Sequence, residues 1–372
     1  MAKLIDITGK ALSGEWGTDD EKGIGIPVLR TTNFTNEGVV DYTDVVTRII
    51  TKKNITEKYL KPGDIIIEKS GGSDKQPVGR VIYFNGPEKK YLFNNFTGLL
   101  RVKEPNKWFP KYVFYSLFGN YRRGGTLPFE NKTTGLHNLK TDDYVSRYEV
   151  KEAKYSKQIE ISEYLDKLYF IIKMREKELV ELDTLIKARF VEMFGDPVNN
   201  SKGLPEATLP ELGEFGRGIS KHRPRNDPKL LGGEYPLIQT GDVAAAELYI
   251  TDYSATYSEI GLKQSKMWNK GTLCITIAAN IAKTAILTFD ACFPDSVVGF
   301  MANDRTSNVF IHYWFSFFQG ILESQAPESA QKNINLKILS ELKVINPSKE
   351  AQENFEQFVE QVDKSKFINC NK

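Results

Sequence analysis

Cysteine is scarce in this sequence, and long apolar runs are missing. Of the 372 residues, three are cysteines (Cys274, Cys292 and Cys370), and none belongs to a CxxC pair. This spacing excludes a disulfide framework and argues against a structural zinc site. No stretch approaches the roughly 18 consecutive apolar residues of a membrane span, and the start MAKLIDITGK lacks the apolar core of a secretory signal. We therefore expect no bound metal, no membrane contact and a cytoplasmic location.

Histidines and catalytic motifs are also few. The sequence has no GxxxxGK(S/T) stretch, no Asp-Pro-Pro-Tyr or Asn-Pro-Pro-Tyr tetrapeptide, no GxGxxG and no HExxH. These absences argue against an ATP-driven translocase, an adenine methyltransferase, a dinucleotide enzyme and a zinc protease. We expect the three histidines in a turn (His137), a basic loop (His222) and an aromatic core (His312). The sequence therefore predicts no catalytic centre.

Neither sign of charge predominates. Fifty Lys and Arg residues against 48 Asp and Glu residues give a net charge of +2. This balance excludes a uniformly basic chain, so any contact with nucleic acid has to come from local basic patches. Apolar residues make up 40% of the chain and charged residues 26%, which is typical of a globular protein. At about 150 residues per domain, the length predicts two to three domains.

What the sequence does contain is a weak internal repeat. IPVLRTTNF (26–34) corresponds to YPLIQTGDV (235–243), and KPGDIII from Lys61 corresponds to NKGTLCI from Asn269. HNLK (137–140) then matches INLK (334–337), and the apolar pattern of 158–168 returns at 352–362. Because four matches keep the same order, we interpret the chain as a globular part followed by a helix, written twice.

Each globular part has the pattern of a mixed α/β domain. Short β-rich runs such as DIIIEKS in the first copy and TLCITIA in the second are separated by glycine and proline turn signals. Each copy also holds an aromatic helical stretch, KYVFYSLFGN from Lys111 and FIHYWFSFFQG from Phe310, which we expect in the core. The predicted fold class is α+β, with two related mixed α/β domains, long antiparallel coiled-coil helices between them and a pseudo-two-fold repeat.

The segment between the copies carries the clearest helical signal. It has no proline or glycine from Ser156 to Phe194, and apolar residues recur at alternating steps of four and three. About 39 residues at 1.5 Å each predict a helix roughly 60 Å long. The predicted seam consists of Ile161, Leu165, Leu168, Ile172, Leu179, Leu182, Ile186 and Met193, with Phe355, Val359 and Val362 in the second copy.

These patterns divide the chain into four parts. We predict a first domain at 1–150, a helical spacer at 151–197, a second domain at 198–346 and a terminal helical region at 347–372. The terminal region aligns with the spacer only as far as Lys372 against Glu178, so the equivalent of 179–196 is missing. We therefore expect the seam residues Leu179, Leu182 and Ile186 to stay exposed and to be available to a partner.

The stretches that form the repeat also resemble a known family. IPVLRTTNF with KPGDIIIEKSGG, YPLIQTGDV with KGTLCITIAAN, and the helix exit LIKARFVEMFGDP are similar to the specificity subunit of type I restriction-modification systems. The resemblance covers nearly the whole chain. It implies two target-recognition domains, each of which reads one half of a split, asymmetric double-stranded DNA sequence, while the helices set the gap between the halves.

The same resemblance implies partners and cofactors. In that family, two methyltransferase subunits dock on the helical regions, and restriction subunits complete the complex. S-adenosylmethionine and ATP with magnesium are then bound by those partners, and this chain binds no cofactor of its own. An alternative from another class stays open, namely a non-catalytic scaffold that binds only proteins through two domains on a coiled-coil rod.

Several loops have the composition of DNA-contacting segments. In the second copy, basic residues gather within 13 positions among glycines and prolines, as in a loop that contacts phosphates. Two glycine-rich polar loops of the first copy allow a similar approach of the backbone to phosphate oxygens. The candidates are Arg217, Lys221, His222, Arg223 and Arg225 in the second copy, and Lys69, Ser70, Lys75, Arg122 and Arg123 in the first.

Base recognition needs side chains that reach the donors and acceptors of the major groove. Arg30 and Asn33 in the first copy, and Gln239 and Asp242 at the matching places of the second, follow a strand and carry suitable groups. A position that is alike in two domains with different targets is more suited to a structural role. The differing pair, Arg30 and Gln239, is therefore the better candidate for base readout.

Overall fold

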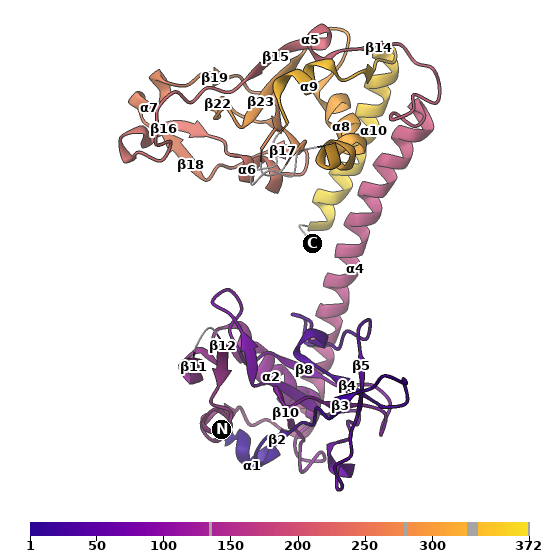
Figure 1. Cartoon of the computed structure of the whole chain (residues 1–372), viewed down its shortest axis with the longest axis vertical. Helices are drawn as coiled ribbons and strands as arrows, with labels where there is room; N and C mark the ends of the chain where they lie inside the picture. Colours follow the sequence, from indigo (N-terminus) through magenta and orange to yellow (C-terminus); the bar gives the residue numbers. More distant parts are fainter. Residues whose placement is uncertain (134–135, 279–280, 326–333, 371–372) are drawn as a thin grey trace. The chain divides into compact units, whose positions relative to one another are not determined.

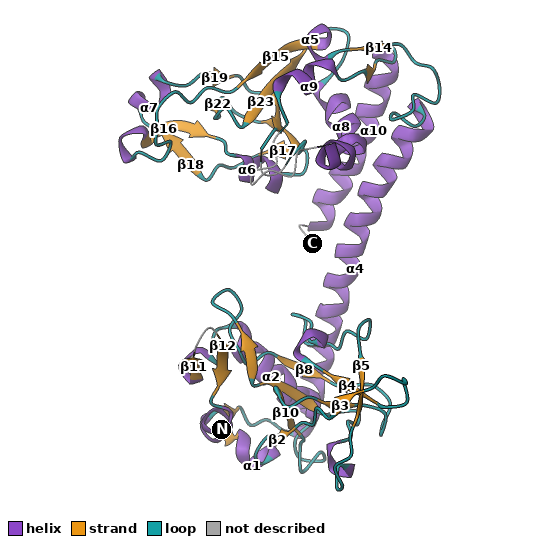
Figure 2. Ribbon diagram, in the orientation of Figure 1, coloured by secondary structure: helices purple, strands orange, loops and turns teal. Residues whose placement is uncertain are grey.

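The computed structural model describes residues 1–133, 136–278, 281–325 and 334–370. The chain divides into two compact units, Met1–Lys173 (unit 1) and Met174–Lys372 (unit 2). The boundary falls inside the longest helix, α4 (Tyr155–Phe194), so each unit contains part of it (Figure 1). Both units combine helices with short strands, as the mixed α/β prediction requires (Figure 2).

Unit 1 is built on an antiparallel sheet whose central strands are entirely apolar or buried. Strand β6 reads IIIE and is buried at all four residues, which explains its place inside the sheet. The aromatic helix α2 (Pro110–Arg122) packs against this sheet at β8. The sheet order is β2 (Leu12–Ser13), β10 (Thr97–Leu100), β6 (Ile65–Glu68) and β8 (Val81–Tyr83).

Smaller sheets complete unit 1. Strand β4 pairs in parallel with β9 and antiparallel with β5, while β1 and β13 join the two ends of the unit, with short helices α1 (Leu4–Thr8) and α3 (Thr141–Arg147) beside them. These sheets comprise β3 (Thr18–Asp19), β5 (Val46–Ile49), β4 (Ile26–Leu29) and β9 (Leu92–Phe93); β11 (Glu130–Thr133), β12 (Leu136–Leu139) and β7 (Ser70–Gly72); and β1 (Ala2–Lys3) with β13 (Glu149–Val150).

Unit 2 repeats this plan. Its buried central strand β20 lies between β23 and β21, and the aromatic helix α8 (Asn308–Gln325) packs on β21 and β23. Strand β16 pairs in parallel with β22, as β4 does with β9. The sheets are β15 (Gly213–Arg217), β23 (Val297–Ala302), β20 (Leu273–Thr276), β21 (Thr284–Leu287) and β17 (Tyr249–Ile250); β18 (Ala255–Tyr257), β16 (Leu231–Leu237), β22 (Ala291–Cys292) and β19 (Met267–Trp268); and β14 (Glu206–Ala207) with β24 (Val344–Ile345).

Matching glycines show that the repeat extends to individual hydrogen bonds. Gly63 and Gly271 both have positive φ, 96° and 90°, a backbone conformation that favours glycine. The Gly63 amide donates to the Phe84 carbonyl at 3.0 Å, and the Gly271 amide donates to the Leu287 carbonyl at 2.8 Å. Each bond closes the turn that leads into the central strand, β6 or β20. The predicted internal repeat is therefore confirmed at this turn.

A second pair of matching bonds follows β4 and β16. The Asn33 Oδ1 atom accepts from the Arg30 amide at 2.8 Å, and the Asp242 Oδ2 atom accepts from the Gln239 amide at 2.7 Å. In both copies, the side chain caps the short helical turn that begins after the strand, η1 (Thr31–Asn33) or α6 (Thr240–Ala245). The carboxamide of Asn33 and the carboxylate of Asp242 thus both accept the capping hydrogen bond of the turn.

A buried glutamine joins each unit to its long helix. Gln158 near the start of α4 is 1% exposed, and Gln352 near the start of α10 (Lys349–Cys370) is fully buried. Gln158 Oε1 accepts from the Phe109 amide at 2.9 Å, Gln352 Oε1 accepts from the Thr306 hydroxyl at 3.0 Å, and each Nε2 donates to backbone carbonyls. Those carbonyls belong to Lys107 and Ala153 in unit 1 and to Arg305 and Pro347 in unit 2.

Within unit 2, α10 lies against the end of α4 (Figure 1). Phe355 contacts Phe190 and Phe194. Further along α10, the Lys366 Nζ atom donates to Asp183 Oδ1 at 2.6 Å, at an earlier position of α4. Because higher numbers on one helix meet lower numbers on the other, the two helices are antiparallel. The seam residues Phe355, Val359 and Val362 are all buried, as predicted.

The predicted seam of α4 needs a correction in its middle. Ile186 was expected to be exposed, but it is fully buried in the core of unit 2, and Leu182 packs against the same core. Most of the exposed apolar residues lie earlier on the helix, where Leu168 and Ile172 are 56% and 55% exposed, while Leu185 and Val191 are exposed on its later part. Other large apolar side chains exposed on this stretch are Tyr164, Tyr169, Phe170, Ile171, Met174 and Val180.

The aromatic stretches lie in the cores, as predicted. Phe114 and Leu117 of α2 are buried in unit 1, and Phe310 and Trp314 of α8 are buried in unit 2. The prediction that His137 lies in a turn is wrong, because it belongs to β12. No helix among the described residues is long and apolar enough to cross a membrane.

Candidate nucleic-acid interface

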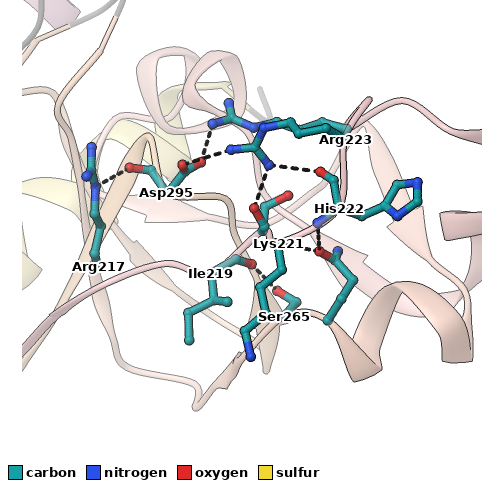
Figure 3. Close-up of polar contacts among 10 residues, drawn as sticks. Arg217, Ile219, Lys221, His222, Arg223, Ser265 and Asp295 are labelled. Carbon is teal, nitrogen blue, oxygen red and sulfur yellow. Dashed lines mark hydrogen bonds and ion pairs between the residues drawn. The ribbon is translucent and has the colours of Figure 1, made fainter.

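The basic loop of unit 2 begins at the end of β15 and reaches η4 (Pro228–Leu230). Figure 3 shows that its arginines converge on Asp295 in the turn before β23, two of them on its carboxylate and one on its backbone carbonyl. Arg217 Nε donates to the Asp295 backbone carbonyl at 2.5 Å, Arg223 Nη2 lies 3.3 Å from Oδ2, and Arg225 pairs with Oδ1. One aspartate therefore gathers three candidate residues that are up to eight positions apart.

Arg223 is also fixed by the loop itself. Its Nη1 atom donates to the carbonyls of Ser220 and His222 at 2.6 and 2.8 Å. The guanidinium group thus has bonds on two sides, although 54% of the side chain is exposed. A cation that is held in place yet open to solvent loses little conformational entropy when it binds an anion.

The backbone of this loop is anchored from a second element. The Gln264 Oε1 atom accepts from the amides of Lys221 and His222 at 2.7 and 3.0 Å, just after helix α7 (Glu259–Lys263). The His222 Nε2 atom lies 3.1 Å from Asp227 Oδ2. The Lys229 amide, with a smaller contribution from His222, lowers the pKa of the Asp227 carboxyl. Lys221 remains exposed beside the arginines.

The charge of this cluster suits an anionic ligand. Two guanidinium groups share the one Asp295 carboxylate, and the third, that of Arg217, is bonded to the neutral Asp295 carbonyl, so the group of four residues keeps two uncompensated positive charges. Guanidinium forks bind phosphate oxygens or the O6 and N7 atoms of guanine through paired N–H donors. The arrangement can therefore contact a nucleic-acid backbone or a base edge.

The candidate residues of unit 1 are more dispersed. Lys69 and Ser70 lie where β6 passes into β7, Lys75 is exposed in the next loop, and Arg122 and Arg123 are exposed at the end of α2. Lys69 Nζ donates to the Ser13 hydroxyl at 3.0 Å, and burial lowers the pKa of its ammonium group.

A polar cavity of about 700 Å³ adjoins Lys69 and Ser70. Asn95 and Asn138 line it with amide groups, and Phe96 beside them is 51% exposed. Amides, an ammonium group and an aromatic ring are the groups that contact bases and phosphates. Only two of the five predicted residues of unit 1 thus share a site.

The readout candidates fall into two groups. Asn33 is 1% exposed and donates to the carbonyls of Asp41 and Asp44, each at 3.0 Å, so its amide is used inside the fold. Asp242 caps α6, as described above. Arg30 is half-buried and pairs with Asp44 at 2.7 Å, whereas the side chain of Gln239 is exposed.

Reasoning from the sequence missed Asp295 and Gln264. Asp295 lies 70 positions beyond Arg225 in a short Pro-Asp-Ser turn, and Gln264 ends a five-residue helix. Nothing in the local composition around either residue signals a contact with the basic loop. The antiparallel pairing of Arg217 with Val298, which the fold shows, brings the loop after β15 beside the turn before β23.

Comparison with known proteins adds to this geometry. A sequence profile described as "Type I restriction modification DNA specificity domain" matches the chain twice, over residues 1–184 and 206–372. A solved chain from "Structural basis underlying complex assembly and conformational transition of the type I R-M system" is similar at 12% identity and a TM-score of 0.59, covering 100% of this chain and 92% of that one.

A second solved structure, the type I restriction-modification S subunit from M. genitalium, is similar at 14% identity and a TM-score of 0.56. The match covers 99% of this chain and 90% of that one. At these identities the structures establish a shared fold, and the profile establishes the relationship in sequence.

Proposed function

This chain belongs to the type I restriction modification DNA specificity domain family, and from that premise we propose that it is the DNA-recognition subunit of a restriction-modification complex. Each unit contacts one half of a two-part, asymmetric DNA target. The chain itself performs no catalysis and directs methyltransferase and restriction subunits to the site.

One observation carries this proposal, namely that the two units keep the same internal bonds but differ on their surfaces. The glycine turns, the capping bonds after β4 and β16, and the buried glutamines match between the units. The exposed polar groups do not match, since Arg30 corresponds to Gln239 and the arginine cluster around Asp295 has no counterpart among the described residues of unit 1. Two units with the same internal structure but different exposed side chains are suited to recognising two different DNA sequences.

Within unit 2, the arginines around Asp295 supply the contacts to DNA. Arg223 and Arg225 are exposed and oriented, so they reach phosphates or guanine edges, and Lys221 adds a phosphate contact. In unit 1, Lys69 and Ser70, with the neighbouring amides of Asn95 and Asn138, do the same from the polar cavity. Gln239 and Arg30 contribute to base readout.

The partner subunits dock on the helices. The exposed apolar residues of α4 between Tyr164 and Val180 give a protein a surface to cover. By analogy with the family, two methyltransferase subunits bind there and bring S-adenosylmethionine, while restriction subunits bring ATP with magnesium. The complex works in the cytoplasm, where the genome is.

The test is to co-express this chain with its neighbouring methyltransferase subunit and to map methylated adenines across the host genome by single-molecule sequencing. We expect a two-part motif with an unspecified gap of constant length. A combined Arg223→Gln and Arg225→Gln variant should relax or remove one half of the motif. It should also reduce the slope of the logarithm of the binding constant against the logarithm of salt concentration, by the amount expected for the loss of up to about two phosphate contacts.

A matched control replaces a lysine outside the loop. Lys337→Gln on α9 (Leu336–Glu341) removes an exposed positive charge and should leave the motif unchanged. If the chain binds the methyltransferase subunit but binds no duplex DNA at any salt concentration, the protein-binding scaffold becomes the better description. A motif without two parts would contradict the proposal.

A further inference from the structure

A cavity of about 660 Å³ lies in unit 2 beside α10, away from the arginine cluster. Val309 from α8, Val359 from α10 and Tyr249 from β17 give it an apolar wall, and Tyr249 is 45% exposed. Glu356, Glu360 and Asp363, on successive turns of α10, give it an acidic side. Such a lining suits a ligand with an apolar stem and a cationic end.

One carboxylate oxygen of this cavity lacks a hydrogen-bond donor in the part of the chain that the structure describes. The Glu356 Oε1 atom is buried and has no hydrogen-bond partner among the described residues. A buried carboxylate oxygen without a donor costs free energy, which a bound N–H group would recover. Glu356 therefore marks the place where a ligand's donor fits.

The nearby lysines leave the cavity open. Lys366 is held by Asp183 at 2.6 Å and lies 3.5 Å from Asp363, so its ammonium group is already engaged. Lys364 also lines the cavity, but its Nζ atom lies 3.7 Å from Glu360 Oε2 in a pair whose side chains are 74% and 68% exposed, and it does not contact Glu356. Burial raises the pKa of the Asp363 carboxyl, so a further cation beside it is favourable.

Unit 1 shows what fills the equivalent place. The buried glutamines align α4 with α10, so Asp166 corresponds to Glu360, and the starts of α2 and α8 align Lys111 with Val309. In unit 1 the Lys111 ammonium group binds Asp166 at 2.7 Å. In unit 2 a valine replaces that lysine, and the cavity lies between Val309 and Glu360. The first copy thus holds an internal cation where the second copy has a cavity.

From these observations we infer that the cavity receives a lysine or arginine side chain from a protein partner, which places Val309, Glu356 and Glu360 in a docking site. The inference rests on the proposed function, and it assigns the basic side chain to the methyltransferase subunit that docks on the helices. Duplex DNA is excluded as the occupant because the carboxylates repel phosphates. Tyr249 and the valines pack against the methylene stem of the entering side chain.

Two variants of the full chain test this inference by titration calorimetry against the purified methyltransferase subunit. Val309→Lys copies Lys111 and fills the cavity from within, so we expect at least tenfold weaker binding with a melting temperature equal to or above that of the wild type. Glu356→Gln keeps the size of the side chain, removes its charge and should also weaken binding severalfold. The matched control is Glu353→Gln on an exposed position of the same helix that does not line the cavity, and it should bind like the wild type.

The outcomes separate this inference from the proposed function. If the wild type binds the methyltransferase subunit and methylates a two-part motif, but Val309→Lys and Glu356→Gln bind equally well, the docking site is wrong and the proposed function stands. If Val309→Lys lowers the melting temperature, its weaker binding could come from unfolding, and the affinity of Glu356→Gln then tests the docking site: weaker binding supports it and unchanged binding contradicts it. If the wild type does not bind the subunit at all, both proposals fail.

Discussion

At the scale of single residues, unit 1 depends on a buried ion pair. Arg80 donates to both carboxylate oxygens of Glu68, at 2.9 and 3.1 Å, and Glu68 is 1% exposed. The same guanidinium also donates to the carbonyls of Thr31 and Phe34, so it connects the segment after β4 to β6. The loop that carries Arg30 is therefore positioned by Arg80.

Arg80→Met should destabilise unit 1 by about 3–5 kcal/mol, because it leaves the Glu68 carboxylate buried without a counter-ion. Urea unfolding combined with amide exchange of β6 measures the loss. The double variant Glu68→Leu with Arg80→Met removes the stranded charge and should recover part of the stability. A cost below about 1 kcal/mol for the single variant would contradict this role.

His312 makes the stability of unit 2 depend on pH. Burial lowers the pKa of its imidazole to about 4, and the Thr284 hydroxyl lies 2.9 Å from Nδ1. Between about pH 6.5 and 4 the unfolded chain binds this proton and the folded chain does not. The free energy of unfolding should therefore fall as the pH falls through that range, by about 2 kcal/mol from pH 7 to 4.5.

The pH prediction is measured by urea unfolding at several pH values. His312→Gln should lose this part of the pH dependence. His222→Gln, at an exposed position, should keep it. Identical pH profiles for His312→Gln and the wild type would show that the imidazole does not cause the effect.

At the scale of elements, α4 has two kinds of apolar surface. In its last turns, Phe190 and Phe194 are buried and pack against Phe355 of α10. In its middle, the apolar side chains of Leu168 and Ile172 are exposed. The buried part stabilises unit 2, and the exposed part contributes little to the stability of the chain alone. The two parts should therefore respond differently to substitution.

The combined variant Leu168→Gln and Ile172→Gln should change the free energy of unfolding by less than about 0.5 kcal/mol, because both side chains already contact water. It should weaken binding of the methyltransferase subunit at least tenfold. Ile186→Gln, at a fully buried position of the same helix, should instead cost about 3 kcal/mol or more. Unfolding curves and co-purification test both expectations, and a large loss of stability in the first variant would contradict them.

The elements also show what a sequence can predict. The long helix, the aromatic core helices and the matched turns followed from periodicity and glycine placement, because these signals are local. The predicted seam missed Phe190. Residues spaced by seven move about 20° per heptad around a straight helix, so the buried stripe passes from the predicted seam positions to Ile186, Phe190 and Phe194. Asp295 was missed because its contacts with Arg223 and Arg225 join segments about 70 positions apart.

At the scale of the whole molecule, two units share one continuous helix. If that helix sets the unread gap, its length is a variable of target choice. Insertion of seven residues, two helical turns, into the exposed middle of α4 adds about 10.5 Å. At about 3.4 Å per base pair, the gap in the methylated motif should lengthen by about three base pairs, with both half-sites unchanged.

Methylation mapping of the insertion variant measures this outcome. Seven residues keep the apolar face nearly in register, so the partner surface stays on one side of the helix. An insertion of the same length in the loop after Gly195 serves as the control, since a loop does not transmit a rigid displacement. An unchanged gap in the helix variant would show that α4 does not act as the spacer.

The buried glutamines Gln158 and Gln352 have one more consequence, for the gene. Each joins its domain to the following helix by similar bonds, with Oε1 accepting one hydrogen bond from the domain and Nε2 donating to backbone carbonyls, so the joint depends little on which domain precedes it. A coding segment for one domain can therefore be exchanged by recombination up to the glutamine codon without rebuilding the joint. If each unit reads one half of the target, as proposed, a single such exchange would give a lineage a new half-target while it keeps the other half.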